Sequence, residues 1–157
     1  MKHSNTEGAD YSASNIKIAI VSARFNGEIV ESMRDAALKT LIEHGMNESN
    51  ITQAYVPGAF ELPLICKQYA TANYDAVIAL GCVIRGDTPH FDYVCHGAAI
   101  GIQQASLDTD KPIAFGVLTT DNLLQAKERS SSANMENNKG RDAALCVLEM
   151  INVIKSI

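Results

Sequence analysis

The chain has 157 residues, of which 46% are hydrophobic and 20% are charged, and its formal net charge is −5. These values are ordinary for one globular domain, and they come without the lysine and arginine clusters that mark nucleic-acid-binding proteins. The polar N-terminus lacks the apolar core of a signal peptide, and no run of about 18 apolar residues could cross a bilayer. We therefore expect a cytoplasmic protein with neither nucleic acid nor a membrane as partner, made of a flexible segment at 1–15 and a single domain at 16–157.

Segments typical of strands alternate with segments typical of helices. Residues 16–21 form a β-branched run that predicts a strand, and apolar residues of 28–44 recur three and four positions apart, as in a helix that ends before Gly45. The pattern then repeats, with strands predicted at 51–56, 76–80 and 112–118 and helices at 62–72 and 93–106. A short fourth helix is predicted to end at 129, followed by a polar connection at 130–138 and a last helix at 141–156. Thr119, Thr120 and Asp121 offer N-caps to the fourth helix.

Such alternation predicts an α/β fold in which helices cover both faces of an open parallel sheet. Ligands of these folds bind at the C-terminal ends of the strands. The loops at those ends lie at 22–27, 57–61, 81–90 and 119–121, and they hold most of the unusual residues of the chain.

The loop at 81–90 has the composition of a reaction site. A turn of Gly86, Asp87 and Thr88 can aim backbone N–H groups at an anion, and His90 can move protons near neutral pH. The glycine patterns that hold dinucleotides or nucleoside triphosphates are absent. The sequence therefore predicts a small phosphorylated substrate.

The cysteines Cys66, Cys82, Cys95 and Cys146 are far apart and lack C-x-x-C spacing, so we expect free thiols in a reducing compartment. A zinc site is an alternative for His90, because Asp92, Cys95 and His96 follow it closely. Their spacing is not a recurrent zinc pattern, and the expectation is that no metal is bound.

Four loop motifs resemble the 6,7-dimethyl-8-ribityllumazine synthase family, and the resemblance runs from about residue 16 to residue 157. The motifs are Ala23-Arg24-Phe25-Asn26, Val56-Pro57-Gly58-Ala59-Phe60-Glu61-Leu62-Pro63, the segment from Gly81 to Val94, and Phe115-Gly116-Val117-Leu118-Thr119-Thr120. The resemblance implies a flavodoxin-like sandwich with strand order 2-1-3-4. It also implies condensation of 5-amino-6-(D-ribitylamino)uracil with 3,4-dihydroxy-2-butanone 4-phosphate, the penultimate step of riboflavin biosynthesis, without a metal or redox cofactor.

The resemblance assigns one group of residues to the ribitylaminouracil. Phe25 would stack on the pyrimidine, Ala59, Phe60 and Glu61 would hold the ribityl chain, Cys82, Val83 and Ile84 would offer backbone contacts, and Phe115 and Lys139 would reach the ring from an adjacent subunit. From the residues alone, Phe25 could instead anchor its loop in the core, and Glu61 could favour a helix N-terminus. The reaction needs no sulfur nucleophile, so we interpret the Cys82 thiol as packing.

A second group would handle the phosphate and the protons. His90 matches the acid–base residue of the family, Asp87 and Thr88 match its phosphate-binding turn, and Arg129 matches its phosphate anchor. We expect the Asp87 carboxylate to point away from the phosphate, toward Arg85 or Arg129. The alternatives are an inert surface histidine and an arginine that merely ends a helix.

The resemblance also implies a homopentamer whose active sites lie between neighbouring subunits. Shell-forming members carry a compact, glycine-containing turn before the last helix, whereas residues 130–138 here are longer and contain no glycine. We expect an isolated pentamer, with a face-to-face decamer as the lesser alternative and a shell of about 60 subunits disfavoured. Association with riboflavin synthase stays open, as do two other functions: a non-catalytic flavin or lumazine carrier and a structural cage protein.

Overall fold

The computed structural model describes residues 15–157, so the flexible segment expected at 1–15 lies, except for Asn15, outside the described residues. Four parallel strands form one sheet in the order β2-β1-β3-β4, as the resemblance implied. The strands are β1 (Ile18–Ala23), β2 (Ile51–Val56), β3 (Ala76–Ile84) and β4 (Ile113–Thr120). In register, Ile18 of the central strand β1 is opposite Ile51 on one side and Ala76 on the other.

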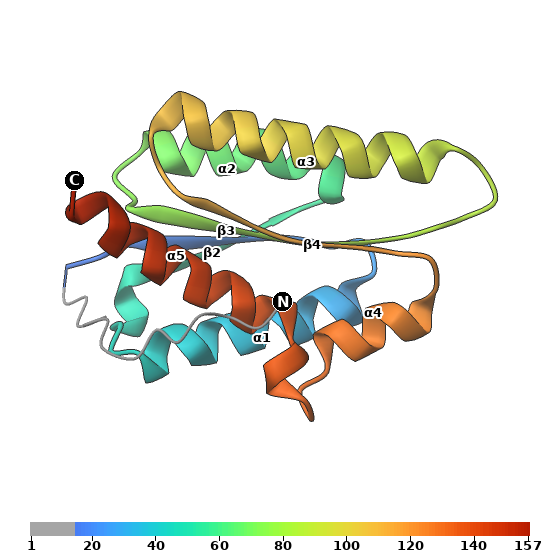
Figure 1. Ribbon diagram of the computed structural model, residues 1–157, viewed down its shortest axis with the longest axis horizontal. Helices are drawn as coiled ribbons and strands as arrows, with labels where there is room; N and C mark the ends of the chain where they lie inside the picture. Colours follow the sequence, from blue (N-terminus) through green and yellow to red (C-terminus); the bar gives the residue numbers. More distant parts are fainter. Residues whose placement is uncertain (1–14) are drawn as a thin grey trace.

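Helices cover both faces of the sheet, which confirms the three-layer sandwich. The helices are α1 (Gly27–Glu43), α2 (Leu62–Thr71), α3 (His90–Thr109), α4 (Leu123–Ser130) and α5 (Lys139–Lys155), with short 3-10 turns at Glu48–Asn50, Ala59–Glu61 and Met135–Asn137. Helices α2 and α3 lie on one face, and α1, α4 and α5 lie on the other (Figure 1).

The side chains of the buried strands alternate between two hydrophobic clusters. Ile18 and Ile20 of β1 pack under α1 and α5, whereas Ala19 and Val21 pack under α2 and α3. A strand that is buried on both faces reads as a continuous apolar run, and this explains why β1 and most of β3 show no polar alternation.

Several boundaries differ from the prediction. Strand β3 continues to Ile84 because its pairing with β4 extends as far as Ile84 opposite Thr120. Helix α3 starts at His90, three positions earlier than predicted, directly after Pro89, whose φ of −62° suits a helix start. The N-cap of α4 is Asn122, whose Oδ1 accepts a hydrogen bond from the N–H of Gln125 at 2.9 Å, so the three predicted N-caps are wrong.

The connection at 130–138 is folded back on its two helices by Asn138. Nδ2 of this fully buried side chain donates to the carbonyl oxygens of Ser130 at 2.9 Å and Ser131 at 3.3 Å, at the end of α4. Its Oδ1 accepts from the N–H groups of Gly140 and Arg141, and this cap starts α5 two residues earlier than predicted. One asparagine thus fixes the end of α4 and the beginning of α5.

Candidate active site

A cavity of about 730 Å³ opens at the C-terminal ends of β1, β2 and β3, where parallel sheets bind ligands. We call it the aromatic cavity. Its lining includes Phe25, Pro57, Gly58, Ala59, Phe60, Glu61, Cys82, Val83, Ile84, Gly86, Thr88, His90, Phe91, Tyr93 and Val94. The C-terminal ends of three strands and the segments after them therefore bring together nine of the residues predicted to bind or convert substrate.

Phe25 reaches this cavity from the loop after β1. The loop is held by backbone hydrogen bonds from Arg24 N–H to Val56 O at 2.8 Å and from Phe25 N–H to Pro57 O at 3.1 Å. Asn26 takes the left-handed conformation, with φ 54°, and its Nδ2 donates to Cys82 O at 2.9 Å. The Phe25 side chain is 70% exposed, which contradicts its alternative interpretation as a core anchor and leaves its face available to a flat ligand.

Phe60 and Glu61 line the aromatic cavity from the segment after β2. A Cβ added at Gly97 of α3 would lie 2.6 Å from the Phe60 ring, so the glycine lets this ring rest on the helix. The Glu61 carboxylate turns back over Gly58, since a Cβ there would lie 3.2 Å from Glu61 Oε2. Glu61 is the N-cap residue of α2 but makes no side-chain cap bond, so its carboxylate is available to a ligand hydroxyl.

Strand β3 contributes Cys82, Val83 and Ile84 to the floor of this cavity. The Cys82 side chain is buried, and burial raises the pKa of its thiol to about 11. A thiol that stays protonated and covered is a poor nucleophile, so the geometry agrees with the interpretation of Cys82 as packing.

His90 lies at the mouth of the aromatic cavity, exposed, as the first residue of α3 rather than in a loop. Its N–H group lies 3.4 Å from Thr88 Oγ1. In the same turn, the N–H groups of Asp92 and Tyr93 donate to the carbonyl oxygen of Pro89, at 2.9 Å and 3.5 Å.

Arg85 pairs with carboxylates other than the one we expected. Its Nε donates to Asp121 Oδ1 at 2.9 Å and its Nη1 lies 3.4 Å from Asp92 Oδ1, while its guanidinium covers the Phe91 ring at 4.3 Å. The hydrogen bond to Asp121 raises the pKa of the Arg85 guanidinium. Arg129 pairs with Glu128 at 3.8 Å. Among the described residues no ion pair joins Asp87 to either arginine, and the direction expected for its carboxylate stays a prediction.

A second cavity, of about 370 Å³, runs along β4, an edge strand of the sheet, beside α5. We call it the cationic cavity. Its lining includes Phe115, Thr119, Thr120, Arg129, Lys139, Asp142 and Cys146. Lys139, the first residue of α5, lies 2.8 Å from Asp142 Oδ2.

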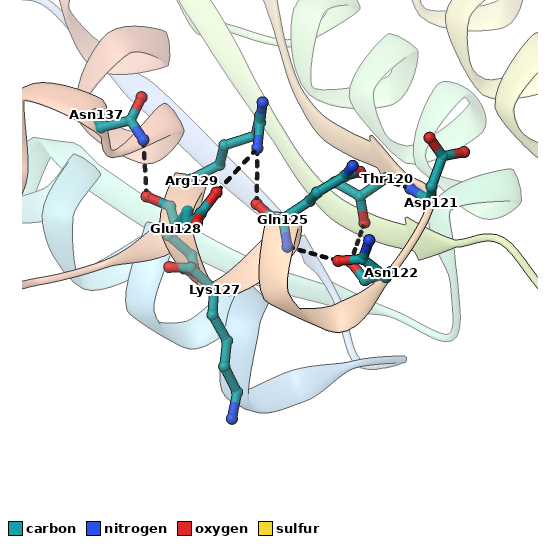
Figure 2. Close-up of polar contacts among 9 residues, drawn as sticks. Thr120, Asp121, Asn122, Gln125, Lys127, Glu128, Arg129 and Asn137 are labelled. Atoms are coloured by element: carbon teal, nitrogen blue, oxygen red, sulfur yellow. Dashed lines mark hydrogen bonds and ion pairs between the residues drawn. The ribbon is translucent and has the colours of Figure 1, made fainter.

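Polar contacts within and around α4 hold Arg129 (Figure 2). Its Nη1 donates to the carbonyl oxygen of Gln125 at 3.0 Å, which is also the contact expected of an arginine that ends a helix. Asn137 Nδ2 donates to the Glu128 carbonyl oxygen at 2.9 Å. The Thr120 hydroxyl donates to the Asn122 carbonyl oxygen at 3.1 Å. The helix is thus fastened at both ends.

The two cavities divide the predicted residues between them and share no lining residue. Thr88 lines the aromatic cavity and Arg129 the cationic cavity, while Asp87 is exposed and lines neither. One chain therefore does not bring the predicted phosphate-binding residues together.

No site role was predicted for Asn26 or Phe91, and Asp121 was predicted only as a possible N-cap. Asn26 could have been found, since asparagine after an aromatic residue at a strand end is a common left-handed turn residue. The Arg85–Asp121 pair could not, because residues 36 positions apart carry no local signal of contact.

The cysteines at 66, 82, 95 and 146 are free thiols. Within residues 15–157, no group of three or more His, Cys, Asp or Glu side chains is placed to hold a metal ion. The zinc alternative for His90 thus lacks a ligand cluster in the described part of the chain.

The sequence model of one family, described as 6,7-dimethyl-8-ribityllumazine synthase, matches residues 15–155. The match spans nearly all of the described residues and includes both cavities. In this same range, no helix has the length and apolar character needed to cross a membrane.

Proposed function

The chain belongs to the 6,7-dimethyl-8-ribityllumazine synthase family, and from this premise we propose which residues carry out its reaction and how its subunits assemble. The chain is a transferase of riboflavin biosynthesis that joins 5-amino-6-(D-ribitylamino)uracil to 3,4-dihydroxy-2-butanone 4-phosphate. The observation that supports the proposal is the division of the predicted residues between two cavities of different chemistry.

The aromatic cavity binds the ribitylaminouracil. Phe25 stacks on the pyrimidine, the backbone of residues 82–84 meets its polar edge, and Ala59, Phe60 and Glu61 hold the ribityl chain. The exposed ring of Phe25 and the carboxylate over Gly58 support these roles, because a flat heterocycle needs an aromatic face and a polyol needs hydrogen-bond acceptors.

His90 moves protons beside the butanone phosphate. The 5-amino group condenses with the butanone carbonyl to a Schiff base and releases water, phosphate is then eliminated, and the ribityl nitrogen closes the second ring with loss of water. Each step transfers protons, and a well-placed acid–base group contributes roughly 10²–10⁴-fold to the rate. The place of His90, at the cavity mouth and next to the turn of Asp87 and Thr88, supports this role.

The cations come from a neighbouring subunit. Arg129 anchors the phosphate with its planar fork, and Phe115 and Lys139 close over the heterocycle. A substrate bound in the aromatic cavity of one subunit needs these groups, but in that subunit they line the cationic cavity. A neighbouring subunit whose cationic cavity faces this aromatic cavity would supply them.

We propose a homopentamer, with a decamer as the lesser alternative. Tyr93, Ile100 and Leu107 lie at heptad spacing on α3, and each is more than half exposed. A helix face of this kind is typical of an interface between subunits. The connection at 130–138 contains a 3-10 turn and no left-handed residue, so its path differs from that of a glycine-containing turn, which disfavours a shell.

We place the enzyme in the cytoplasm, because four free thiols suit a reducing compartment.

Two measurements test the proposal. Lumazine fluorescence after the two substrates are mixed should report product, and its absence would contradict the assigned reaction. Light scattering should give a mass near five times the 16.9 kDa of one chain. A monomer would contradict the shared site, and a particle near sixty times that mass would contradict the isolated pentamer.

A further inference from the structure

The loop between β3 and α3 has few contacts of its own. Residues 86–90 are all exposed, and a Cβ added at Gly86 would meet no atom within 4 Å. The contact of the His90 N–H with Thr88 Oγ1 is long, at 3.4 Å. Segments with so few buried contacts open easily. A loop that must hold a phosphate and an acid–base group in fixed places therefore needs support from outside.

Arg85 provides contacts on both sides of this loop. Its backbone N–H donates to Thr120 O at 2.8 Å, and its Nε donates to Asp121 Oδ1 at 2.9 Å, so it is tied to the end of β4. The same guanidinium lies over Phe91 and within 3.4 Å of Asp92 Oδ1. Phe91 and Asp92 directly follow His90 in the first turn of α3. One side chain thus joins the ends of two strands to the turn that carries His90.

We propose that Arg85 is a positioning residue: it fixes the first turn of α3 against the end of the sheet and so holds His90 at the aromatic cavity. This inference rests on the acid–base role proposed for His90. A planar guanidinium suits the task because it can bond two carboxylates at once while its face covers an aromatic ring. An ammonium group offers a single point charge and cannot make the same set of contacts.

A competing role for Arg85 is direct contact with the substrate phosphate. In the structure its Nε and Nη1 already face the carboxylates of Asp121 and Asp92. The two roles predict opposite effects of removing these carboxylates. If Arg85 acts through them, their loss disables it; if it binds phosphate, their loss frees it.

The experiment compares Arg85→Gln with the double variant Asp92→Asn/Asp121→Asn. In both we expect kcat to fall about tenfold, while KM for the ribitylaminouracil stays within about twofold, because the walls that bind the pyrimidine are untouched. Arg85→Lys should restore only part of kcat. Exposed ion pairs contribute little to folding, and Arg85 is about half exposed, so the melting temperatures should hardly change.

Lys67→Gln is the matched control. Lys67 bonds Asp108 at 2.8 Å between α2 and α3, with a similar exposure, but it lies outside both cavity linings. We expect it to leave kcat unchanged. A fall in kcat equal to that of Arg85→Gln would mean that any such surface pair matters, and would overturn the proposal.

Further outcomes separate this inference from the proposed function. A normal kcat in Arg85→Gln would overturn the positioning role alone. The same holds if kcat is low in Arg85→Gln but normal in the double aspartate variant. A normal kcat in His90→Ala would overturn both. When His90 is already replaced by Ala, Arg85→Gln should cost little more, since a positioning residue has nothing left to position.

Discussion

The aromatic and cationic cavities differ in how the chain builds them. The aromatic cavity is made by loops that directly follow three strands and are held by backbone hydrogen bonds such as that from Arg24 to Val56. The cationic cavity lies along β4, but its cations belong to two helices, α4 and α5, whose ends are fixed by side-chain amides, those of Asn122, Asn137 and Asn138. Strand-end loops therefore shape the aromatic cavity, while helix caps set the place of the cations.

The chemistry of the two cavities is also complementary. The aromatic cavity has aromatic faces and a histidine, whereas the cationic cavity has an arginine and a lysine beside one aromatic ring. A substrate pair that includes a heterocycle and a phosphate requires both sets. Under the proposed function neither cavity is sufficient by itself, and this makes their separate contributions measurable.

The largest expected effect comes from the aromatic cavity. His90→Ala should lower kcat roughly ten- to a thousandfold while both substrates still bind, because the ring assists proton transfer rather than holding the pyrimidine. Steady-state kinetics by lumazine fluorescence would measure this. His44→Ala, at the C-cap of α1 and outside both cavity linings, is the control that should keep full activity. An unchanged kcat in His90→Ala would contradict the acid–base assignment.

The second effect comes from the cationic cavity. Arg129→Ala should raise KM for the butanone phosphate by about ten- to a hundredfold, since a charge-assisted bidentate contact is lost, and Arg129→Lys should recover only part of it. Lys127→Ala is the control, because Lys127 points away from Arg129 in Figure 2. Equal weakening of the ribitylaminouracil would count against a contact with the phosphate alone.

A third experiment combines the two cavities. If His90→Ala and Arg129→Ala subunits are unfolded together and refolded as mixed pentamers, roughly a quarter of the interfaces should pair an intact aromatic cavity with an intact cationic one. Activity should then rise well above that of either variant. Two independent cavities within each chain would give no such recovery, and that result would rule out a shared site.

The smallest expected effect concerns the thiols. Near pH 8, iodoacetamide should modify Cys146, which is exposed, but only slowly, because burial and the charge of Glu149 raise the pKa of its thiol. It should spare Cys82, because burial raises the pKa of Cys82 to about 11 and its thiolate forms only as the pH approaches that value. Mass spectrometry identifies the modified residue. Since Cys146 lines the cationic cavity, we expect a loss of about two- to fivefold in kcat/KM for the butanone phosphate. Modified Cys82 in the folded protein would contradict its burial.

The sequence predicted the architecture well because the strands are short apolar runs and the first helix has clear periodicity. It failed where tertiary pairing decides a boundary, as in β3, which continues through Gly81 and Cys82 only because β4 pairs with it. The N-cap of α4 was misplaced for the same reason, since pairing holds Thr120 in the strand.

For the candidate site, local motifs predicted which residues line a cavity but not which cavity. Thr88 and Arg129 were both assigned to the phosphate, yet they line different cavities of the chain. The carboxylate partners of Arg85 were also missed, because ion pairs between distant segments depend on the packed fold. The spacing of residues along the chain predicts neither the cavity that a residue lines nor its ion-pair partner.

The start of α5 has a consequence for how the chain can vary. Gly140 packs against α1 so closely that a Cβ there would lie 1.9 Å from Met33 O, and the neighbouring Asn138 bonds the end of α4. The 3-10 turn before it is held as well, because the Asn138 N–H donates to Met135 O at 3.2 Å and Asn137 bonds Glu128 O. Insertions at 132–133, before this turn, are therefore expected to leave both cations in place, so that the outline of the subunit could change while its chemistry stays the same.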